Sequence, residues 1–291
     1  MIGLIHALIY CVVIPVVVMA MLSASLERTA PHVANYRGVQ VYNGLGIVWF
    51  VWLVSYWVGA HLLVALGVGQ PAWVSYLVPL FPLIAGSCAF GLFDDWVGDK
   101  TAKGFRGHLH ALRHGALTTG GVKFIGIGFL SLFTAVSLYW DGPLSLVRIV
   151  LVTCVIALTA NLMNLFDLRP GRAGKMYLLG LIATLVVVGI SGIVKLGGWD
   201  MAALALAGLG PLVAVWRFDA GEKGMLGDAG ANSMGAFLGF LLATSLPLWG
   251  LALLTVALFS VNVLSERVSF SKIVDGNRLL SFLDGLGRPE K

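Results

Sequence analysis

Residues 73–96 read WVSYLVPLFPLIAGSCAFGLFDDW, in which the first 21 residues, 73–93, are uncharged and Asp94 and Asp95 follow them directly. The hydrocarbon core of a bilayer is about 30 Å thick, and a helix needs about 20 predominantly apolar residues to cross it. This stretch therefore predicts a transmembrane helix that ends in two acidic side chains at the membrane surface.

The rest of the chain has the same apolar character. Of the 291 residues, 58% are hydrophobic and 11% are charged, whereas soluble domains carry about 25% charged residues. This composition excludes a soluble globular fold and predicts an all-α, polytopic transmembrane helix bundle. Residues 1–264 form its transmembrane domain and residues 265–291 a C-terminal tail. The apolar runs place about nine spans at residues 2–23, 41–69, 73–93, 123–140, 145–166, 176–194, 201–216, 230–247 and 249–264.

Nine spans divide the charged residues unequally between the two faces of the membrane. One face receives 17 of the 19 Lys and Arg residues, all except Arg148 and Lys195, together with 12 of the 14 acidic residues. Because loops rich in Lys and Arg stay in the cytoplasm, the N-terminus is predicted outside and the C-terminal tail in the cytoplasm. The net charge of +5 is spread over short loops, not over one contiguous basic face, which argues against nucleic acid as a partner.

Asp94 and Asp95 leave the third predicted span together. Two adjacent carboxylates near low dielectric repel each other unless a cation neutralises them, so the pair indicates a divalent metal or proton chemistry. The alternative is that the pair only ends a helix at the interface. The loop that follows is rich in Lys, Arg and His and leads to Lys123. Cations beside paired acids suit a substrate that carries phosphates and a metal.

A second motif ends the fifth predicted span. Asn161, Asn164 and Asp167 follow one another at a spacing of three residues, which places them on one stripe of an otherwise apolar helix. Polar groups in an apolar helix are costly unless they are used. The stripe therefore predicts contacts with a substrate, and hydrogen bonding between helices is the alternative.

A third motif, Gly-Asp-Ala-Gly at residues 227–230, precedes the eighth predicted span. Glycines next to a helix N-terminus let backbone amides approach an anion, while the carboxylate of Asp228 holds a metal. Alone, this motif is often only a turn. Its occurrence on the same predicted face as the other acids favours a shared site.

Taken in order, these motifs resemble those of the polyprenyl-phosphate N-acetylhexosamine-1-phosphate transferases. This superfamily contains phospho-MurNAc-pentapeptide translocase and UDP-GlcNAc:undecaprenyl-phosphate GlcNAc-1-phosphate transferase. The first loop also fits, because Asn35-Tyr36-Arg37-Gly38 and the glycines at residues 44 and 46 look like the family's basic residue and its glycine entry into the second helix. The resemblance covers residues 30–240.

The resemblance implies a magnesium-dependent enzyme that moves a sugar-1-phosphate from a UDP-sugar to a polyprenyl phosphate and releases UMP. Such enzymes act at the cytoplasmic face of the bacterial inner membrane in cell-wall peptidoglycan or surface-glycan synthesis. The implied partners are the lipid phosphate, the UDP-sugar and the membrane, and a homodimer is left open. The implied catalytic residues are Asp94, Asp95 and Asp167, and the implied Mg²⁺ ligand is Asp228. The implied substrate contacts are Arg37, Lys123, Asn161 and Asn164.

Two features depart from the family pattern. Family members commonly read Asp-Gly-x-Asp-Gly after the asparagines, whereas this chain has Pro170 in place of the second acid, and its tail lacks the family's histidine-rich motif. A relative that has lost catalysis and binds polyprenyl phosphate or a partner protein is therefore one alternative. A transporter is another, although a translocation path needs polar groups through the middle of the bilayer, and here they cluster on one face.

Overall fold

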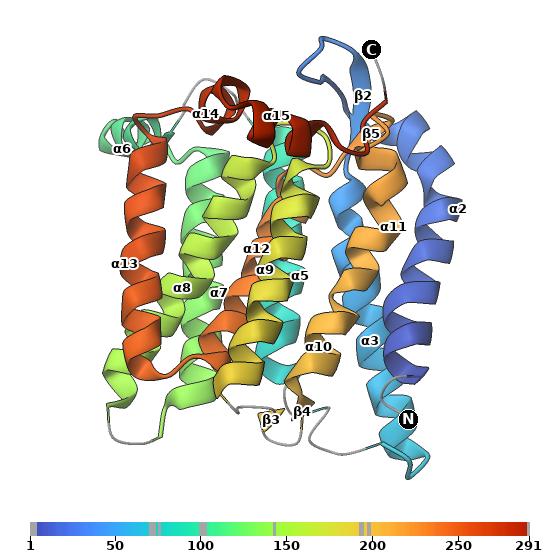
Figure 1. Cartoon of the computed structure of the whole chain (residues 1–291), viewed down its shortest axis with the longest axis vertical. Helices are drawn as coiled ribbons and strands as arrows, with labels where there is room; N and C mark the ends of the chain where they lie inside the picture. The colour runs from blue at the N-terminus through green and yellow to red at the C-terminus, as the bar shows by residue number, and fades with distance from the viewer. Residues whose placement is uncertain are drawn as a thin grey trace.

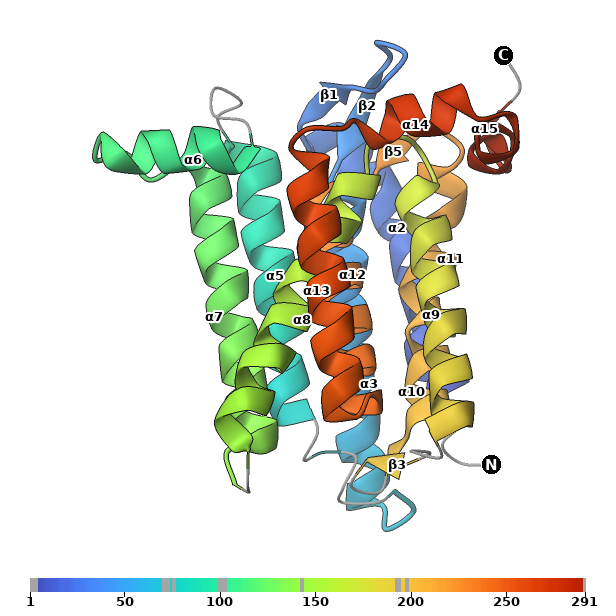
Figure 2. The same cartoon turned by 60° about the vertical axis from the view of Figure 1, so that its left-hand side comes forward.

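The structure, a computed structural model, describes residues 5–69, 74, 77–98, 104–141, 144–191, 195–196 and 199–289. Lys100 and Lys103 of the predicted basic loop lie outside these ranges. Long helices run side by side, and short helices cross one end of the bundle (Figure 1; Figure 2). The helices are η1 (Ala7–Val13), α2 (Ile14–Thr29), η2 (Leu45–Ile47), α3 (Val48–Ala65), α5 (Leu77–Val97), α6 (Gly104–Arg113), α7 (Thr119–Tyr139), α8 (Ser145–Phe166), α9 (Arg172–Ser191), α10 (Met201–Ala207), α11 (Leu209–Asp219), α12 (Gly227–Ser245), α13 (Leu248–Ser265), α14 (Phe270–Gly276) and α15 (Arg278–Gly285).

Three short strands form a sheet in the order β1-β2-β5. Strands β1 (His32–Ala34) and β2 (Gln40–Asn43) make an antiparallel hairpin, and β5 (Gly224–Met225) joins β2 in parallel. Because residues 40–43 pair in this sheet, the second long helical segment begins at Leu45, and the predicted start at residue 41 is wrong. The sheet holds the residues that precede η2 against those that precede α12. A second pair of strands, β3 (Lys195–Leu196) and β4 (Trp199–Asp200), is antiparallel.

Seven helices among the described residues are long and apolar enough to cross a membrane, so the chain is a multi-pass helix bundle. The predicted span 201–216 falls on two shorter helices, α10 and α11, which meet at Gly208. The predicted span 230–247 falls on α12, whose first half contains glycines, Asp228, Asn232 and Ser233. The count of nine spans and the orientation of the termini therefore stay predictions.

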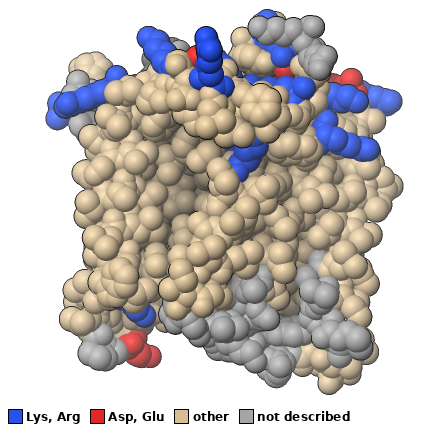
Figure 3. All heavy atoms as spheres, viewed as in Figure 1, with Lys and Arg blue, Asp and Glu red and all other residues tan. Residues whose placement is uncertain are grey.

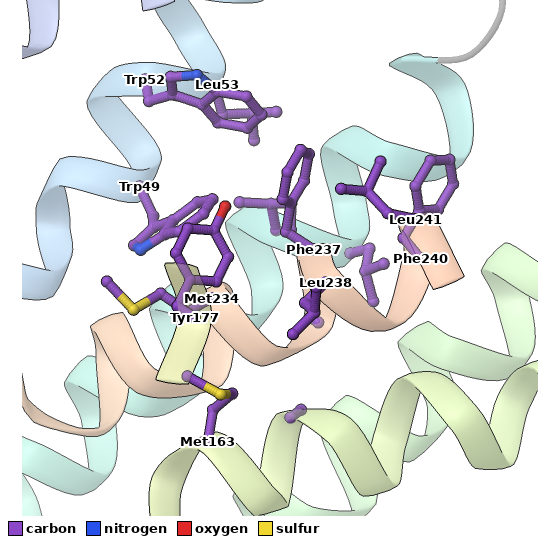
Figure 4. Packing of buried hydrophobic residues seen from close by; sticks show 14 of the residues in the cluster. Trp49, Trp52, Leu53, Met163, Tyr177, Met234, Phe237, Leu238, Phe240 and Leu241 are labelled. Atoms are coloured by element: carbon purple, nitrogen blue, oxygen red, sulfur yellow. The ribbon is translucent and has the colours of Figure 1, made fainter. Parts of the chain in front are cut away.

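Helix α12 is the centre of the bundle. Nearly all of its side chains are buried, and it packs against α5, α8 and α9. Aromatic rings of α3 close one side of it, with the centroids of Trp52 and Phe237 5.2 Å apart and those of Trp49 and Phe237 5.7 Å apart (Figure 4). Edge-to-face and tilted contacts of this kind stabilise buried aromatic clusters.

Lysine and arginine side chains gather at one end of the bundle, which we call the charged end (Figure 3). The end of α5, the starts of α7 and α12, the three-stranded sheet and helices α14 and α15 all lie there (Figure 1). Helix α8 begins at the opposite end, with Arg148 in its first turn. The motifs that the sequence places on one face of the membrane thus lie at one end of the bundle.

The contact between α12 and α8 depends on Gly235. A Cβ atom on this residue would lie 2.5 Å from both the Cα of Ala160 and the carbonyl oxygen of Thr159. These neighbours are backbone atoms, so the two helices can pack this closely only because residue 235 has no side chain.

We expect Gly235→Ala to lower the unfolding temperature of the detergent-solubilised protein, because α8 and α12 must separate to admit the methyl group. The matched control is Gly189→Ala in α9, where nothing lies within 4 Å of the added Cβ. That change should be neutral or stabilising, because alanine favours helix over glycine by about 1 kcal/mol. Equal melting temperatures for the two variants would contradict the close packing.

Candidate functional site

Lys123 joins two of the carboxylates that the sequence places in one site. Its Nζ lies 2.8 Å from Asp94 Oδ2, and it also forms an ion pair with Asp228 Oδ2. The hydroxyl of Thr119 donates a hydrogen bond of 2.5 Å to Asp94 Oδ1. Helices α5, α7 and α12 therefore each supply a charged group to one point at the charged end.

Local sequence explains how α7 presents these groups. Thr118 caps the helix, because its hydroxyl accepts a hydrogen bond of 3.1 Å from the amide of Gly121. A threonine cap of this kind fixes where a helix begins. Thr119 and Lys123 then stand four residues apart on one face of the helix, and both reach Asp94.

The end of α5 reaches the start of α12 because Gly91 has no side chain. A Cβ atom on Gly91 would lie 2.3 Å from the Cα of Ala229. The two backbones therefore touch one turn before the acidic pair. This contact brings Asp94 and Asp95 beside the first turn of α12, where Asp228 lies.

Asp95 faces the backbone of α12, not Lys123. Its Oδ1 accepts hydrogen bonds from the amide of Asp228 at 2.9 Å and from Asn43 Nδ2 at 3.0 Å, and its Oδ2 accepts one from the amide of Ala229 at 3.0 Å. A carboxylate at a helix N-terminus satisfies amides that have no partner within the helix and interacts favourably with the helix dipole. The two adjacent acids thus have different partners.

Asn43 is a site residue that the sequence reasoning missed. It is the last residue of β2, and its side-chain amide holds Asp95. The only signal in the sequence was its place directly before the glycines at residues 44 and 46. Its contribution depends on the pairing of β2 with β5, which local sequence does not reveal.

Asp167 follows the end of α8 and is partly buried. Burial raises the pKa of its carboxyl group well above the ordinary value, and the negative charges of Asp219, Asp228 and Asp95 raise it further. Asp219, a second residue that the sequence reasoning missed, accepts hydrogen bonds from the amides of Gly171 and Leu226. Burial raises the pKa of Asp219 to about 6. Asp219 therefore joins the segment that follows α8 to the segment that precedes α12.

Two predicted substrate-binding residues have other partners. Asn161 donates a hydrogen bond of 2.6 Å to Asn262 on α13, which is the contact between helices that was the alternative for this stripe. Arg37 lies in the β1–β2 hairpin, where it forms an ion pair of 3.2 Å with Glu222 and donates to the hydroxyl of Tyr36. Asn164, one turn beyond Asn161 on α8, is partly buried.

The C-terminal tail is docked on the segment that follows α8. Arg172 donates to both carboxylate oxygens of Asp284 at 2.7 and 2.9 Å, and Arg288 forms an ion pair with Asp284 at 3.0 Å. Arg169 makes a similar two-bond contact with Asp275, at 2.7 and 2.6 Å. Burial opposes ionisation of Asp284, but its contacts with Arg172 and Arg288 hold its pKa below the ordinary value.

The residues that could hold a metal are Asp94 and Asp228. In the part of the chain that the structure describes, no three His, Cys, Asp or Glu side chains form a metal-binding group. The two carboxylates do lie within reach of one ammonium group. Mg²⁺ is commonly held by one or two carboxylates, with water and substrate phosphates completing its shell. The pair fits that mode and not a cage made wholly of protein groups.

We expect Asp95→Ala to lower the free energy of unfolding by about 2 kcal/mol, because two amides at the start of α12 lose their buried acceptor. The measurement is the unfolding transition in detergent. The matched control is Asp94→Asn, which leaves both amides bonded to Asp95. It should lower the free energy of unfolding by less than Asp95→Ala does. If the control is destabilised as much as Asp95→Ala, Asp95 has no special structural role.

The Asp284 contacts predict that α15 detaches from the bundle in acid. The folded carboxyl has a lowered pKa, so its stabilisation is present above the ordinary value of about 3.9 and is lost as the pH falls through the folded pKa. A fluorophore on Ser281→Cys should have constant rotational mobility from pH 7 to pH 5 and greater mobility below about pH 4.

Two variants control this experiment. Asp284→Asn should free the fluorophore at every pH. Asp275→Asn should leave the pH dependence unchanged, because exposed ion pairs stabilise little, and the Asp275 side chain is 47% exposed. If the mobility of the label does not change with pH while Asp275 and Asp284 are both present, Asp284 does not hold the tail.

No family model matches the chain, and no curated protein gives a significant match. The function must therefore be argued from the contacts described above.

Proposed function

We propose that this chain is a magnesium-dependent membrane transferase. It moves a sugar-1-phosphate from a UDP-sugar to a polyprenyl phosphate at the charged end, which faces the cytoplasm of a bacterial cell. The products are a lipid-diphospho-sugar and UMP, and the reaction belongs to cell-wall or surface-glycan synthesis. The acceptor keeps its tail in the bilayer while the donor is soluble and charged, so the reaction must occur where the bundle meets water.

The observation that carries this proposal is the ion-paired group of Asp94, Lys123 and Asp228. A lysine and two carboxylates at one point are the groups that a metal-bound diphosphate requires, since the acids hold the cation and the lysine contacts the phosphate oxygens. All three side chains are largely buried, with 14 to 27% of their surface exposed. Electrostatic contacts are stronger where water is excluded.

Asp228, together with Asp94, holds Mg²⁺ in this proposal. The bound ion would polarise the diphosphate and offset the negative charge that develops on UMP. Asp95 fixes the amide of Asp228 and thereby the position of that carboxylate. Asp95 is thus a positioning residue.

In the proposed reaction, an oxygen of the lipid phosphate forms a bond to the β-phosphorus of the UDP-sugar. The bond from that phosphorus to the bridging oxygen breaks, and its electron pair leaves with UMP. Lys123 donates hydrogen bonds to the diphosphate and stabilises the charge that builds up there. Because the second pKa of a phosphate monoester is about 6, orientation matters more than base strength near neutral pH.

A second candidate is a relative that binds polyprenyl phosphate or a partner protein without catalysis. The docked tail favours it, because Asp275 and Asp284 engage Arg169 and Arg172, two cations that would otherwise be available to an anionic substrate. Pro170 also stands where the family commonly has an acid. The two candidates differ in whether UMP is released.

The purified protein should release UMP when it is incubated in detergent with undecaprenyl phosphate, Mg²⁺ and one member of a panel of UDP-sugars. Removal of Mg²⁺ by EDTA should stop the release. Asp228→Asn should abolish turnover, because it removes a charge that holds the metal. The measurement is UMP formation with lipid-linked sugar as the second product.

The control is Asp141→Asn, which changes an exposed acid just after the end of α7, at the far end of that helix from Lys123, and should keep full activity. If no UDP-sugar gives UMP, the second candidate replaces the first. If Asp228→Asn keeps full activity, Asp228 is not part of the metal site.

A further inference from the structure

Helix α15 docks against the side of α9. Arg172 and Lys175 stand three residues apart on one face of the first turn of α9, and both hold the end of α15. Arg172 binds the carboxylate of Asp284, while Lys175 donates to the main-chain oxygens of Leu283 and Asp284 at 3.0 and 2.6 Å. Figure 2 shows α15 at the outer edge of the bundle, beside the upper ends of α9 and α11.

This docking sets the level of α15 relative to a membrane. Residues Arg172–Ile190 of α9 form one of the seven segments that are long and apolar enough to span a bilayer. The first turn of such a segment lies where the hydrocarbon core meets the headgroups. A helix fixed to the side of that turn therefore lies at the same boundary.

The face of α15 opposite Asp284 is apolar. Leu279 and Phe282 are each 65% exposed, and Leu286, which directly follows the helix, is 47% exposed. At 100° per residue, these three positions point away from the side on which Asp284 meets Arg172. Leu179 and Ile182 on α9 are exposed as well. Helix α15 thus presents an exposed apolar face beside a membrane-length helix whose own exposed side chains are apolar.

Exposed basic side chains occur along the same C-terminal tail. Arg267, Lys272 and Arg278 are exposed in and next to α14 and α15. Helices that lie in the membrane interface combine leucine and phenylalanine on one face with Lys and Arg that contact anionic lipid headgroups. The apolar and basic side chains together indicate that this face contacts a phospholipid surface.

We propose that α15 is an interfacial membrane helix, with Leu279, Phe282 and Leu286 inserted at the boundary between headgroups and acyl chains. The inference does not depend on the transferase reaction. Through the contact of Asp284 with Arg172, it ties the segment that follows Asp167 to the membrane surface. The tail then acts as a lipid contact, not as a free cytoplasmic extension.

The test places a nitroxide on Phe282→Cys in the full chain, reconstituted in phosphatidylglycerol-containing vesicles. Cys11 and Cys88 are buried, so a Cys154→Ser background leaves the introduced thiol as the reactive one. Oxygen concentrates in lipid and a nickel chelate in water. We expect the ratio of oxygen to nickel collision rates at residue 282 to exceed the ratio at a water-exposed control several-fold.

Two further labels calibrate the ratio. Val39→Cys gives a water-exposed control, because Val39 is an exposed apolar residue in the β1–β2 hairpin, and Leu179→Cys on α9 gives a lipid-facing one. A nickel accessibility at residue 282 equal to that at Val39 would place the face in water and overturn the proposal. Low accessibility to both reagents would show that a second copy or another protein covers the face, and it would overturn the proposal equally.

Discussion

Two adjacent carboxylates at the end of an apolar helix must each find positive charge or hydrogen-bond donors, and the charged end of this bundle is organised by that requirement. Asp94 obtains Lys123 and Thr119 from α7, while Asp95 obtains two amides from α12 and the side chain of Asn43. Neither acid can be satisfied by its own helix. The pair therefore joins α5, α7, α12 and the β2 strand at one point.

The scaffold supports this arrangement through the small residues of α12 and its neighbours. Glycines at residues 91 and 235 let α5 and α8 approach the central helix to backbone contact, and the aromatic cluster around Phe237 fills the space beside α3. Such contacts fix how far each helix is shifted along its neighbour, the relative height of the helices, because any shift would break contacts in an interior packed as densely as a crystal. The height of α5 relative to α12 in turn decides whether Asp94 and Asp228 can share Lys123.

Local sequence was sufficient for the class of fold, a multi-pass helix bundle, and for the shared location of Asp94, Lys123 and Asp228, because hydropathy and charge sidedness act over single segments. It was insufficient wherever a partner comes from a distant segment. The capping role of Asp95 depends on an amide 133 residues later, and the pairing of Asn161 depends on Asn262 in α13. The start of the second predicted span, at residue 41, was wrong because residues 40–43 pair with β1 and β5. The docked tail was missed because its Arg–Asp contacts have no local periodicity.

The parallel pairing of β2 with β5 has a consequence for how the chain is made. Asn43 emerges early in synthesis, and the amides of Asp228 and Ala229 emerge only after most of the chain has been built. Until then, Asp95 lacks those two donors, and the charged end stays open to water. Contacts that close such long loops form late in folding. A chain that ends before residue 229 therefore leaves Asp95 without two of its donors, so synthesis through the start of α12 is a condition for assembling the charged end.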